Sequence, residues 1–246
     1  MARTALVTGA ASGIGAAIAR HLADGGHRVG LLDRDGDGLL RAERELRAKG
    51  DTVVAVEVDV ADESSVVAGV EAVRAELGPI EIVVTAAGIA PNRHFPDITV
   101  DFWDRMFAVN VTGTMTCIQA ALPDMMAGGW GRVVTISSSA GQQGTGHMVA
   151  YSASKGAVMS LTRALSHEVA SQGITVNSIS PGVIDTPLFR MTLDDAGVTD
   201  PGVVVQLVPT ARLGTVDELA AVGAFLCSEE ASYVTGQIIG VNGGMC

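Results

Sequence analysis

Cysteine is scarce in this sequence, and long apolar runs are missing from it. The three cysteines, Cys117, Cys227 and Cys246, are widely spaced and form no C-x-x-C pattern. This spacing predicts free thiols in a reducing compartment and excludes a disulfide framework and a cysteine zinc site. No run approaches the roughly 18 apolar residues of a membrane helix, and the first residues enter a strand-like run instead of a signal-peptide core. We therefore expect a cytoplasmic protein without a metal and without a membrane partner.

Basic residues and prolines are few as well. Sixteen lysines and arginines stand against 27 acidic residues and give a net charge of -11, which argues against binding to nucleic acid or to an anionic membrane surface. Only eight prolines accompany 30 glycines, a ratio that indicates tight turns and close backbone approaches. With 246 residues and 48% hydrophobic content, the chain can bury the core of one α/β domain.

Short apolar runs alternate with amphipathic stretches of helix length along the chain. The apolar runs are RTALVTG, RVGLLD, TVVAVEVDV, IEIVVTAAG, GRVVTISS, GITVNSISPG and GQIIGVNGG, and helices are predicted at residues 14–24, 39–49 and 64–77. Nearly continuous hydrophobicity is typical of strands covered by helices on both faces. The pattern predicts one α/β domain over residues 1–246, a Rossmann-like doubly wound parallel sheet of about seven strands. Residues 186–212 are irregular and follow a strand end, where such sheets bind ligands, so a substrate lid is predicted there.

A glycine-rich turn joins the first predicted strand to the first predicted helix. Gly9, Gly13 and Gly15 in VTGAASGIG allow positive φ and let N–H groups at a helix N-terminus approach a pyrophosphate. Asp33 ends the second strand, where a carboxylate accepts hydrogen bonds from the adenosine ribose and repels a 2′-phosphate. Arg34 follows directly and could contact a 2′-phosphate, but we give the carboxylate more weight. NAD is therefore predicted in preference to NADP.

Two further strand ends suit the same cofactor. Asp59 follows the third strand, at the rim where an adenine amino group could be recognised. Gly88 follows the fourth strand and allows the cofactor to approach the backbone closely. Together with the glycine turn, these residues trace one dinucleotide across the carboxyl edge of one sheet.

An ordered set of motifs resembles the short-chain dehydrogenase/reductase family along essentially the whole chain. The motifs are TGAASGIG from Thr8, AAG from Ala86, Asn110 in AVNVTGT, ISSS from Ile136, YSASK from Tyr151 and SPGVIDTP from Ser180. Each motif alone is common, but the ordered set is highly specific. One departure is Thr85-Ala86-Ala87-Gly88, where the family usually has Asn-Asn-Ala-Gly. The absence of the two amides raises the question of how the central strands are tied together.

The resemblance implies a catalytic group, a set of cofactor contacts and a set of substrate contacts. The catalytic group is Asn110, Ser138, Tyr151 and Lys155; Ser138 is chosen among three serines because the family's serine stands thirteen residues before the tyrosine. The implied cofactor contacts are Gly9, Ser12, Gly13, Ile14, Gly15, Asp33, Asp59, Val60, Ala87, Gly88, Tyr151, Lys155, Pro181, Gly182, Val183 and Thr186. The expected substrate contacts are Ser138, Gln143, His147 and Tyr151, with Gln142, residues 89–94 and the lid also lining the pocket. The resemblance also implies a homotetramer.

The chemistry of the predicted group centres on a tyrosine and a lysine. Hydride transfer between a carbinol carbon and nicotinamide needs a group that exchanges a proton with the substrate oxygen. A free tyrosine, with a pKa of about 10, is a poor base near neutrality. Lys155 shares a helix face with Tyr151, so its charge, together with that of oxidised nicotinamide, is expected to lower the tyrosine pKa. Ser138 can hold the substrate oxygen; the resemblance adds that Lys155 binds the nicotinamide ribose and that Asn110 helps to hold a relay water.

The sequence thus predicts an NAD-dependent oxidoreductase that acts on a small-molecule secondary alcohol or ketone, with cyclic, aryl and steroid-like molecules in the natural class. Arg93 and Arg190 are the only cations expected near the substrate. A 3-oxoacyl-(acyl-carrier-protein) reductase that uses NADPH is the alternative enzyme, although Asp33 and the negative net charge disfavour it. A non-catalytic NAD-binding sensor or scaffold is the alternative of another class, and the intact catalytic group argues against it.

Overall fold

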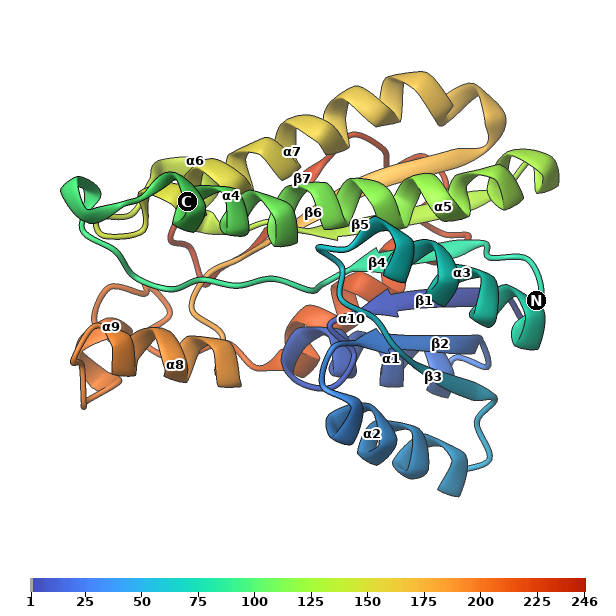
Figure 1. Ribbon diagram of the computed structural model, residues 1–246, viewed down its shortest axis with the longest axis horizontal. Helices are drawn as coiled ribbons and strands as arrows, with labels where there is room; N and C mark the ends of the chain where they lie inside the picture. Colours follow the sequence, from blue (N-terminus) through green and yellow to red (C-terminus); the bar gives the residue numbers. More distant parts are fainter. Residues whose placement is uncertain (1) are drawn as a thin grey trace.

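A parallel β-sheet of seven strands, in the order β3-β2-β1-β4-β5-β6-β7, forms the centre of the protein (Figure 1). The computed structural model describes residues 2–246. The strands are β1 (Thr4–Thr8), β2 (Arg28–Asp33), β3 (Val53–Glu57), β4 (Ile82–Thr85), β5 (Gly131–Ile136), β6 (Ile174–Pro181) and β7 (Ile238–Val241). Every residue of β1, β4, β5 and β6 is buried, which explains why these strands are almost continuously apolar in sequence.

Helices cover both faces of the sheet. Figure 1 shows α3, α5 and α7 on one face and α1, α2 and α10 on the other. Their bounds are α1 (Gly13–Asp24), α2 (Gly36–Ala48), α3 (Glu63–Leu77), α5 (Gly113–Gly128), α7 (Val149–Val169) and α10 (Val216–Leu226). Successive strand residues point to opposite faces, so Val83 joins one apolar core and Val84 the other. The predicted doubly wound α/β fold is confirmed.

The strand order places a crevice between β1 and β4. β1 pairs with β2 on one side and with β4 on the other, so the chain crosses from one half of the sheet to the other after β3. Ligands bind in doubly wound sheets at this reversal of strand order, outside the carboxyl ends of the strands. The glycine turn after β1 and the loop after β4 form the two sides of that crevice.

Four shorter helices lie around the carboxyl ends of the strands. They are α4 (Val100–Phe107), α6 (Ser139–Gln143), α8 (Pro187–Asp195) and α9 (Gly202–Val205). Figure 1 shows α8 and α9, in orange, beyond the strand ends and apart from the two helical layers. These two helices occupy the segment predicted as a lid; its function as a lid stays a prediction.

The predicted helices are present with small shifts at their ends. α2 begins at Gly36 rather than at residue 39, because the Asp35 carboxylate caps the helix and accepts a hydrogen bond from the Gly38 N–H at 3.0 Å. None of the helices within residues 2–246 is both long enough and apolar enough to cross a membrane.

Gly30 provides a test of how closely α3 packs on β2. A Cβ added at Gly30 would lie 2.5 Å from Cγ1 of Val73, and the branched Val73 side chain is stiff. We expect Gly30→Ala to lower the free energy of unfolding by about 1–3 kcal/mol through overpacking, as measured by urea denaturation. Val73→Ala in the same chain should recover part of the loss. A double variant that is less stable than either single variant would contradict this packing.

Candidate active site

The glycine turn after β1 lies directly against the loop after β4. Gly9 has φ +68°, and a Cβ there would lie 2.8 Å from the backbone N of Ala87. A Cβ at Gly15 would lie 2.2 Å from the carbonyl oxygen of Gly9. Glycine is therefore required at both positions because a side chain would not fit, and at Gly9 also because φ is positive. The turn leads into the N-terminus of α1, where backbone N–H groups can receive a pyrophosphate.

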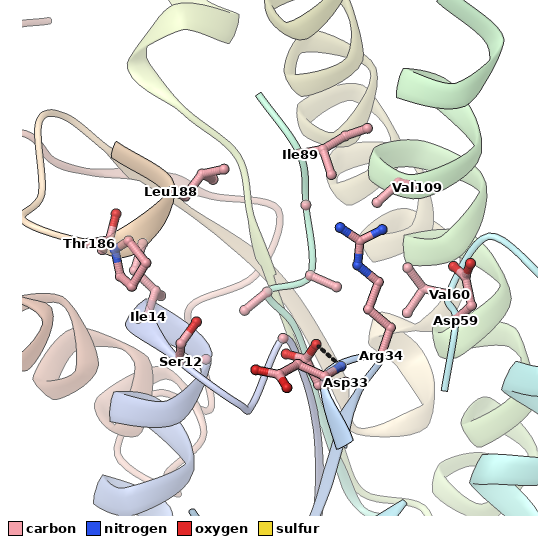
Figure 2. Close-up of a pocket in the computed structure, with 18 of the residues that line it drawn as sticks. Ser12, Ile14, Asp33, Arg34, Asp59, Val60, Ile89, Val109, Thr186 and Leu188 are labelled. Atoms are coloured by element: carbon pink, nitrogen blue, oxygen red, sulfur yellow. Dashed lines mark hydrogen bonds between the residues drawn. The ribbon is translucent and has the colours of Figure 1, made fainter. Parts of the chain in front are cut away.

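A cavity of about 370 Å³ opens above this turn (Figure 2). Eleven of the predicted cofactor residues line it: Gly9, Ser12, Gly13, Ile14, Gly15, Asp33, Asp59, Val60, Ala87, Gly88 and Thr186. A Cβ at Gly13 would lie 3.6 Å from Cγ2 of Thr186, so the start of α8 closes one side of the cavity against the glycine turn. The cavity lies at the carboxyl ends of the strands and is lined by backbone of the glycine turn, as dinucleotide sites of such sheets are.

The remaining predicted cofactor residues do not line this cavity. Pro181 ends β6, and Gly182 follows it with its N–H donating to the Val241 carbonyl at 3.1 Å. Val183 lies next along the chain, where its carbonyl accepts a hydrogen bond from the Gly214 N–H at 2.9 Å. Tyr151 and Lys155 lie on α7, behind the wall that Gly88 provides. Their contact with a cofactor stays a prediction.

The cavity lining includes three carboxylates, Asp33, Asp35 and Asp59, and two guanidinium groups, Arg34 and Arg105. Asp33 accepts hydrogen bonds from the backbone N–H groups of Ala11 and Asp35, each at 3.1 Å. Figure 2 shows the Arg34 side chain extending across the pocket toward Ile89 and Val109. Both Asp33 and Arg34 therefore face the space where the adenosine ribose is expected.

Arg105 is a lining residue that the sequence did not single out. It lies on α4, and its Nη2 reaches Oδ2 of Asp59 at 3.4 Å, although the two residues stand 46 positions apart. The other oxygen of Asp59 accepts from the Ala61 N–H at 2.9 Å. No local signal marks Arg105, because only the packing of α4 beside the third strand end brings it to this carboxylate.

Asn110 sits in a π-helical segment between α4 and α5. The segment Ala108–Thr112 interrupts the helix, as π-bulges at functional sites commonly do. The Asn110 side chain is fully buried; its Oδ1 accepts from the Ile89 N–H at 2.9 Å, and its Nδ2 donates to the Ile89 carbonyl at 3.0 Å. The amide therefore holds the loop after β4, and its predicted contact with a relay water stays a prediction.

Ser138, Tyr151 and Lys155 come together where β5 ends and α6 packs on α7. Ser138 caps α6, with its Oγ accepting from the Ala140 N–H at 3.1 Å. Lys155 is buried, donates from Nζ to the Ile136 carbonyl at 2.8 Å and lies 5.8 Å from the centre of the Tyr151 ring. A Cβ at Gly88 would lie 3.5 Å from Lys155 Nζ. A single backbone position, Gly88, thus separates the cavity from Lys155.

Burial sets the electrostatics of this pair in the protein by itself. Burial raises the pKa of the Tyr151 phenol, against a smaller lowering by its hydrogen bond with Ser138. Burial also lowers the pKa of Lys155 from 10.5 to about 8. The predicted lowering of the Tyr151 pKa depends on the charge of oxidised nicotinamide as well as that of Lys155, so it stays a prediction; in the protein by itself, loss of hydration raises this pKa.

The predicted substrate residues Gln143 and His147 lie at the end of α6 and on the segment between α6 and α7. His147 adopts φ +60° and packs against His94, with the rings tilted and 5.4 Å between their centres, and its carbonyl accepts from the Arg93 N–H at 2.8 Å. Gln143 is exposed at the end of α6. Gln142 is exposed as well, and its Oε1 accepts from Ser180 Oγ at 2.9 Å.

Both cations expected near the substrate are engaged by other side chains. Arg190 forms two hydrogen bonds with Asp185, at 3.0 and 3.1 Å. Arg93 lies over the Phe102 ring, 4.8 Å from its centre. Neither guanidinium is held ready for a substrate carboxylate.

A second pair of contacts connects α8 to the loop after β4. Asn92 Nδ2 donates to the Thr192 carbonyl at 2.8 Å, and Thr192 Oγ1 donates to the Ala90 carbonyl at 3.4 Å. With Thr186 against the glycine turn, α8 is attached at both of its ends.

Thr8 connects the two central strands, β1 and β4, in place of the two amide side chains that the sequence lacks. Its Oγ1, at the end of β1, accepts from the backbone N–H groups of Ala86 and Ala87, each at 3.1 Å. The Thr85 Oγ1 is buried without a hydrogen-bond partner among the described residues. A threonine on the neighbouring strand therefore fixes the first part of this loop.

Comparison with known proteins agrees with this geometry. The model of the family described as enoyl-(acyl carrier protein) reductase matches residues 9–246. The cis-4-hydroxycyclohexanecarboxylate dehydrogenase of Sinomonas cyclohexanicum is 40% identical over 98% of this chain and 96% of its own length. The 3-oxoacyl-(acyl-carrier-protein) reductase FabG of Escherichia coli is 37% identical over 99% of this chain and 97% of its own.

The solved structures agree as well. The actinorhodin polyketide ketoreductase, in a structure with NADPH, superposes with a TM-score of 0.95 at 34% identity and covers 99% of this chain and 97% of its own. Identity of this extent over nearly full length, the matching family model and the shared fold lead to one conclusion. The chain belongs to the short-chain dehydrogenase/reductase family and is an oxidoreductase that acts on CH–OH groups with a nicotinamide cofactor.

Proposed function

We propose that the protein is an NAD-dependent dehydrogenase of neutral secondary alcohols, or a reductase of the matching ketones, with cyclic molecules as the preferred class. One observation carries this proposal most directly: Lys155 Nζ and Asn110 Oδ1 both lie close to Gly88, which lines the cavity, while the Tyr151 ring centre lies 5.8 Å from Lys155 Nζ. A proton-exchanging group thus lies beside the place where nicotinamide is expected.

The proton chemistry follows from these side chains. Ser138 orients the substrate oxygen by a hydrogen bond, and Tyr151 exchanges a proton with that oxygen. Lys155, held by the Ile136 carbonyl at 2.8 Å, presents its ammonium to the phenol and stabilises the phenolate when the proton leaves. Bound nicotinamide supplies the hydride acceptor or donor. Asn110 keeps the wall between the cavity and the phenol in place through Ile89.

The residues of the cavity suit NAD. The Asp33 carboxylate is oriented by two backbone N–H groups and keeps free lone pairs for the ribose hydroxyls. A 2′-phosphate would meet its negative charge at short range, a repulsion that weakens binding. Arg34 faces the same space and supplies an attraction that partly offsets this repulsion, so the preference rests on Asp33.

A neutral, cyclic substrate is favoured by two observations. Arg93 lies over the Phe102 ring and Arg190 is paired with Asp185, so neither cation expected near the substrate points to a charged substrate group. The relative from Sinomonas cyclohexanicum is a cis-4-hydroxycyclohexanecarboxylate dehydrogenase; its substrate supports the ring, although that substrate also carries a carboxylate. A panel of cyclic and open secondary alcohols and ketones, assayed with NAD and with NADP, tests the proposal; no turnover of any member with either cofactor would overturn it.

A reductase of 3-oxoacyl thioesters that uses NADPH is the second candidate. The relative from Escherichia coli and the NADPH-bound ketoreductase structure favour it. The net charge of -11 opposes docking of an acidic carrier protein, and Asp33 opposes NADPH. Faster reduction of an acetoacetyl thioester by NADPH than of any cyclic ketone by NADH would select this candidate. The cytoplasmic location and the homotetramer expected from the sequence stay predictions.

Tyr151→Phe separates catalysis from cofactor binding. The substitution removes the proton-exchanging hydroxyl, so we expect kcat to fall by about 100- to 10,000-fold, while NADH binding measured by fluorescence titration stays nearly unchanged. Tyr233→Phe is the matched control, because Tyr233 is fully exposed and far from the chemistry. Near-normal activity of Tyr151→Phe would exclude this mechanism.

Asp33→Asn tests the choice of cofactor. The amide keeps an acceptor for one of the two backbone N–H groups but loses the charge, so the ratio of kcat/KM for NADP to that for NAD should rise by about 100-fold, or roughly 3 kcal/mol. Asp37→Asn removes the same charge from an exposed position outside the cavity and should leave the ratio unchanged. An equal rise of the ratio in both variants would mean that the overall negative charge of the protein, and not Asp33 in particular, sets the cofactor preference.

Lys155→Met tests the cost of the buried lysine. With a pKa of about 8 in the folded chain against 10.5 otherwise, Lys155 binds its proton more tightly in the unfolded chain. The wild type should therefore gain stability relative to the variant as pH rises from about 8 to about 10, by up to about 3 kcal/mol. Urea unfolding of both proteins from pH 7 to pH 10 measures this change. A stability difference that does not vary with pH would contradict the shifted pKa.

A further inference from the structure

The serine of the YSASK motif has a place in the structure that the proposed mechanism does not use. We propose that Ser154 is a positioning residue that couples Asn110, and through it the wall of the cofactor cavity, to the backbone of Tyr151. Ser154 is fully buried on α7. Its Oγ lies 2.7 Å from the Tyr151 carbonyl oxygen and 3.0 Å from Asn110 Nδ2.

The direction of each hydrogen bond follows from the partners. A carbonyl oxygen can only accept, so the Ser154 hydroxyl donates to Tyr151. The Asn110 NH₂ group can only donate, so Ser154 Oγ accepts from it. The orientation of the amide is fixed independently, because the Ile89 N–H needs Asn110 Oδ1 as its acceptor at 2.9 Å. Ser154 has one orientation that satisfies both neighbours.

These bonds form a continuous connection from the cavity to the catalytic tyrosine. Ile89 lines the cavity, and both of its backbone polar groups bind the Asn110 side chain. Asn110 binds Ser154, and Ser154 binds the carbonyl of Tyr151. A shift of the wall at Ile89 is therefore transmitted to the residue that must meet the substrate oxygen. A misplacement of about 1 Å at such a position can lower the rate by about 100-fold.

A purely local function of Ser154 in helix α7 is the competing explanation, and the same helix contains its control. Ser166 Oγ donates to the Arg163 carbonyl at 2.7 Å, three residues earlier, with the same length and the same spacing as the bond from Ser154 to Tyr151. Ser166 is also buried, but it has no bond to Asn110. Ser154→Ala and Ser166→Ala therefore remove the same local bond, and only the first removes the connection to the cavity wall.

The kinetic test compares these two variants. We expect Ser154→Ala to lower kcat by about 10- to 100-fold with little change in KM for NAD, because the Asn110 bonds to Ile89 still hold the wall. Ser166→Ala should keep the wild-type kcat. Asn110→Ala combined with Ser154→Ala should be no slower than Asn110→Ala alone, because both act through one connection. A wild-type kcat for Ser154→Ala, or equal losses in both serine variants, would overturn the proposal.

A spectroscopic test does not depend on turnover. The chain has two tyrosines, and Tyr233 is fully exposed, so Tyr233→Phe leaves Tyr151 as the only tyrosine to titrate by its phenolate absorbance. The hydrogen bond with Ser138 lowers the Tyr151 pKa; if Ser154 holds the phenol at Ser138, Ser154→Ala should raise the midpoint, and Ser166→Ala should not. An unmoved midpoint in Ser154→Ala would overturn the proposal.

The inference rests on the proposed function, and the two can fail separately. Absence of turnover in the substrate panel would overturn the function, whereas the phenolate titration would still measure whether Ser154 positions Tyr151. Should Ser154→Ala fail to fold, Ser154→Cys keeps a side chain of similar size with a weak donor and acceptor. We expect Ser154→Cys to raise the Tyr151 midpoint as well, but by less than Ser154→Ala. A midpoint equal to that of the protein with Ser154 would overturn the proposal.

Discussion

The loop from Ala86 to Ile89 is held in place by side chains of other elements, and the site depends on this constraint. Thr8 accepts from the N–H groups of Ala86 and Ala87, and Asn110 binds both polar groups of Ile89. The loop forms the wall of the dinucleotide cavity on one side and approaches Lys155 on the other. The proposed cofactor site and the proposed proton-transfer site are therefore positioned by the same rigid loop. Catalysis needs preorganisation of this kind.

Tyr151 and Lys155 lie in an environment that disfavours their charged forms. Burial raises the pKa of Tyr151 and lowers that of Lys155 to about 8, so each group is drawn toward neutrality in the protein alone. Such shifts reduce stability and are characteristic of functional sites. The π-helical segment at Asn110 is a local irregularity of the kind found at functional sites. It contains the amide that binds Ile89.

The fold and the glycine turn could be predicted because their signals are local. Strand hydrophobicity, the spacing from Gly9 to Gly15 and the carboxylate at Asp33 all lie within short windows of sequence. Arg105 could not be found in this way, since only the packing of α4 brings it to Asp59. The rise of the Tyr151 pKa in the protein by itself could not be predicted, because the depth at which α7 is buried is a property of the whole sheet and its helical layers. Thr8 could not be identified as the replacement for the missing amides, because its two bonds cross from β1 to the loop after β4.

The attachment of α8 at both ends has a consequence for the timing of the catalytic cycle. Thr186 lies against the glycine turn and Asn92 holds the Thr192 carbonyl, so the helix bridges the mouth of the cavity from one side of the crevice to the other. If α8 acts as the predicted lid, a dinucleotide would leave by this route only after one attachment opens. In enzymes with such bridging segments the opening step often limits kcat. Release of the used cofactor, rather than proton transfer at Tyr151, would then limit kcat.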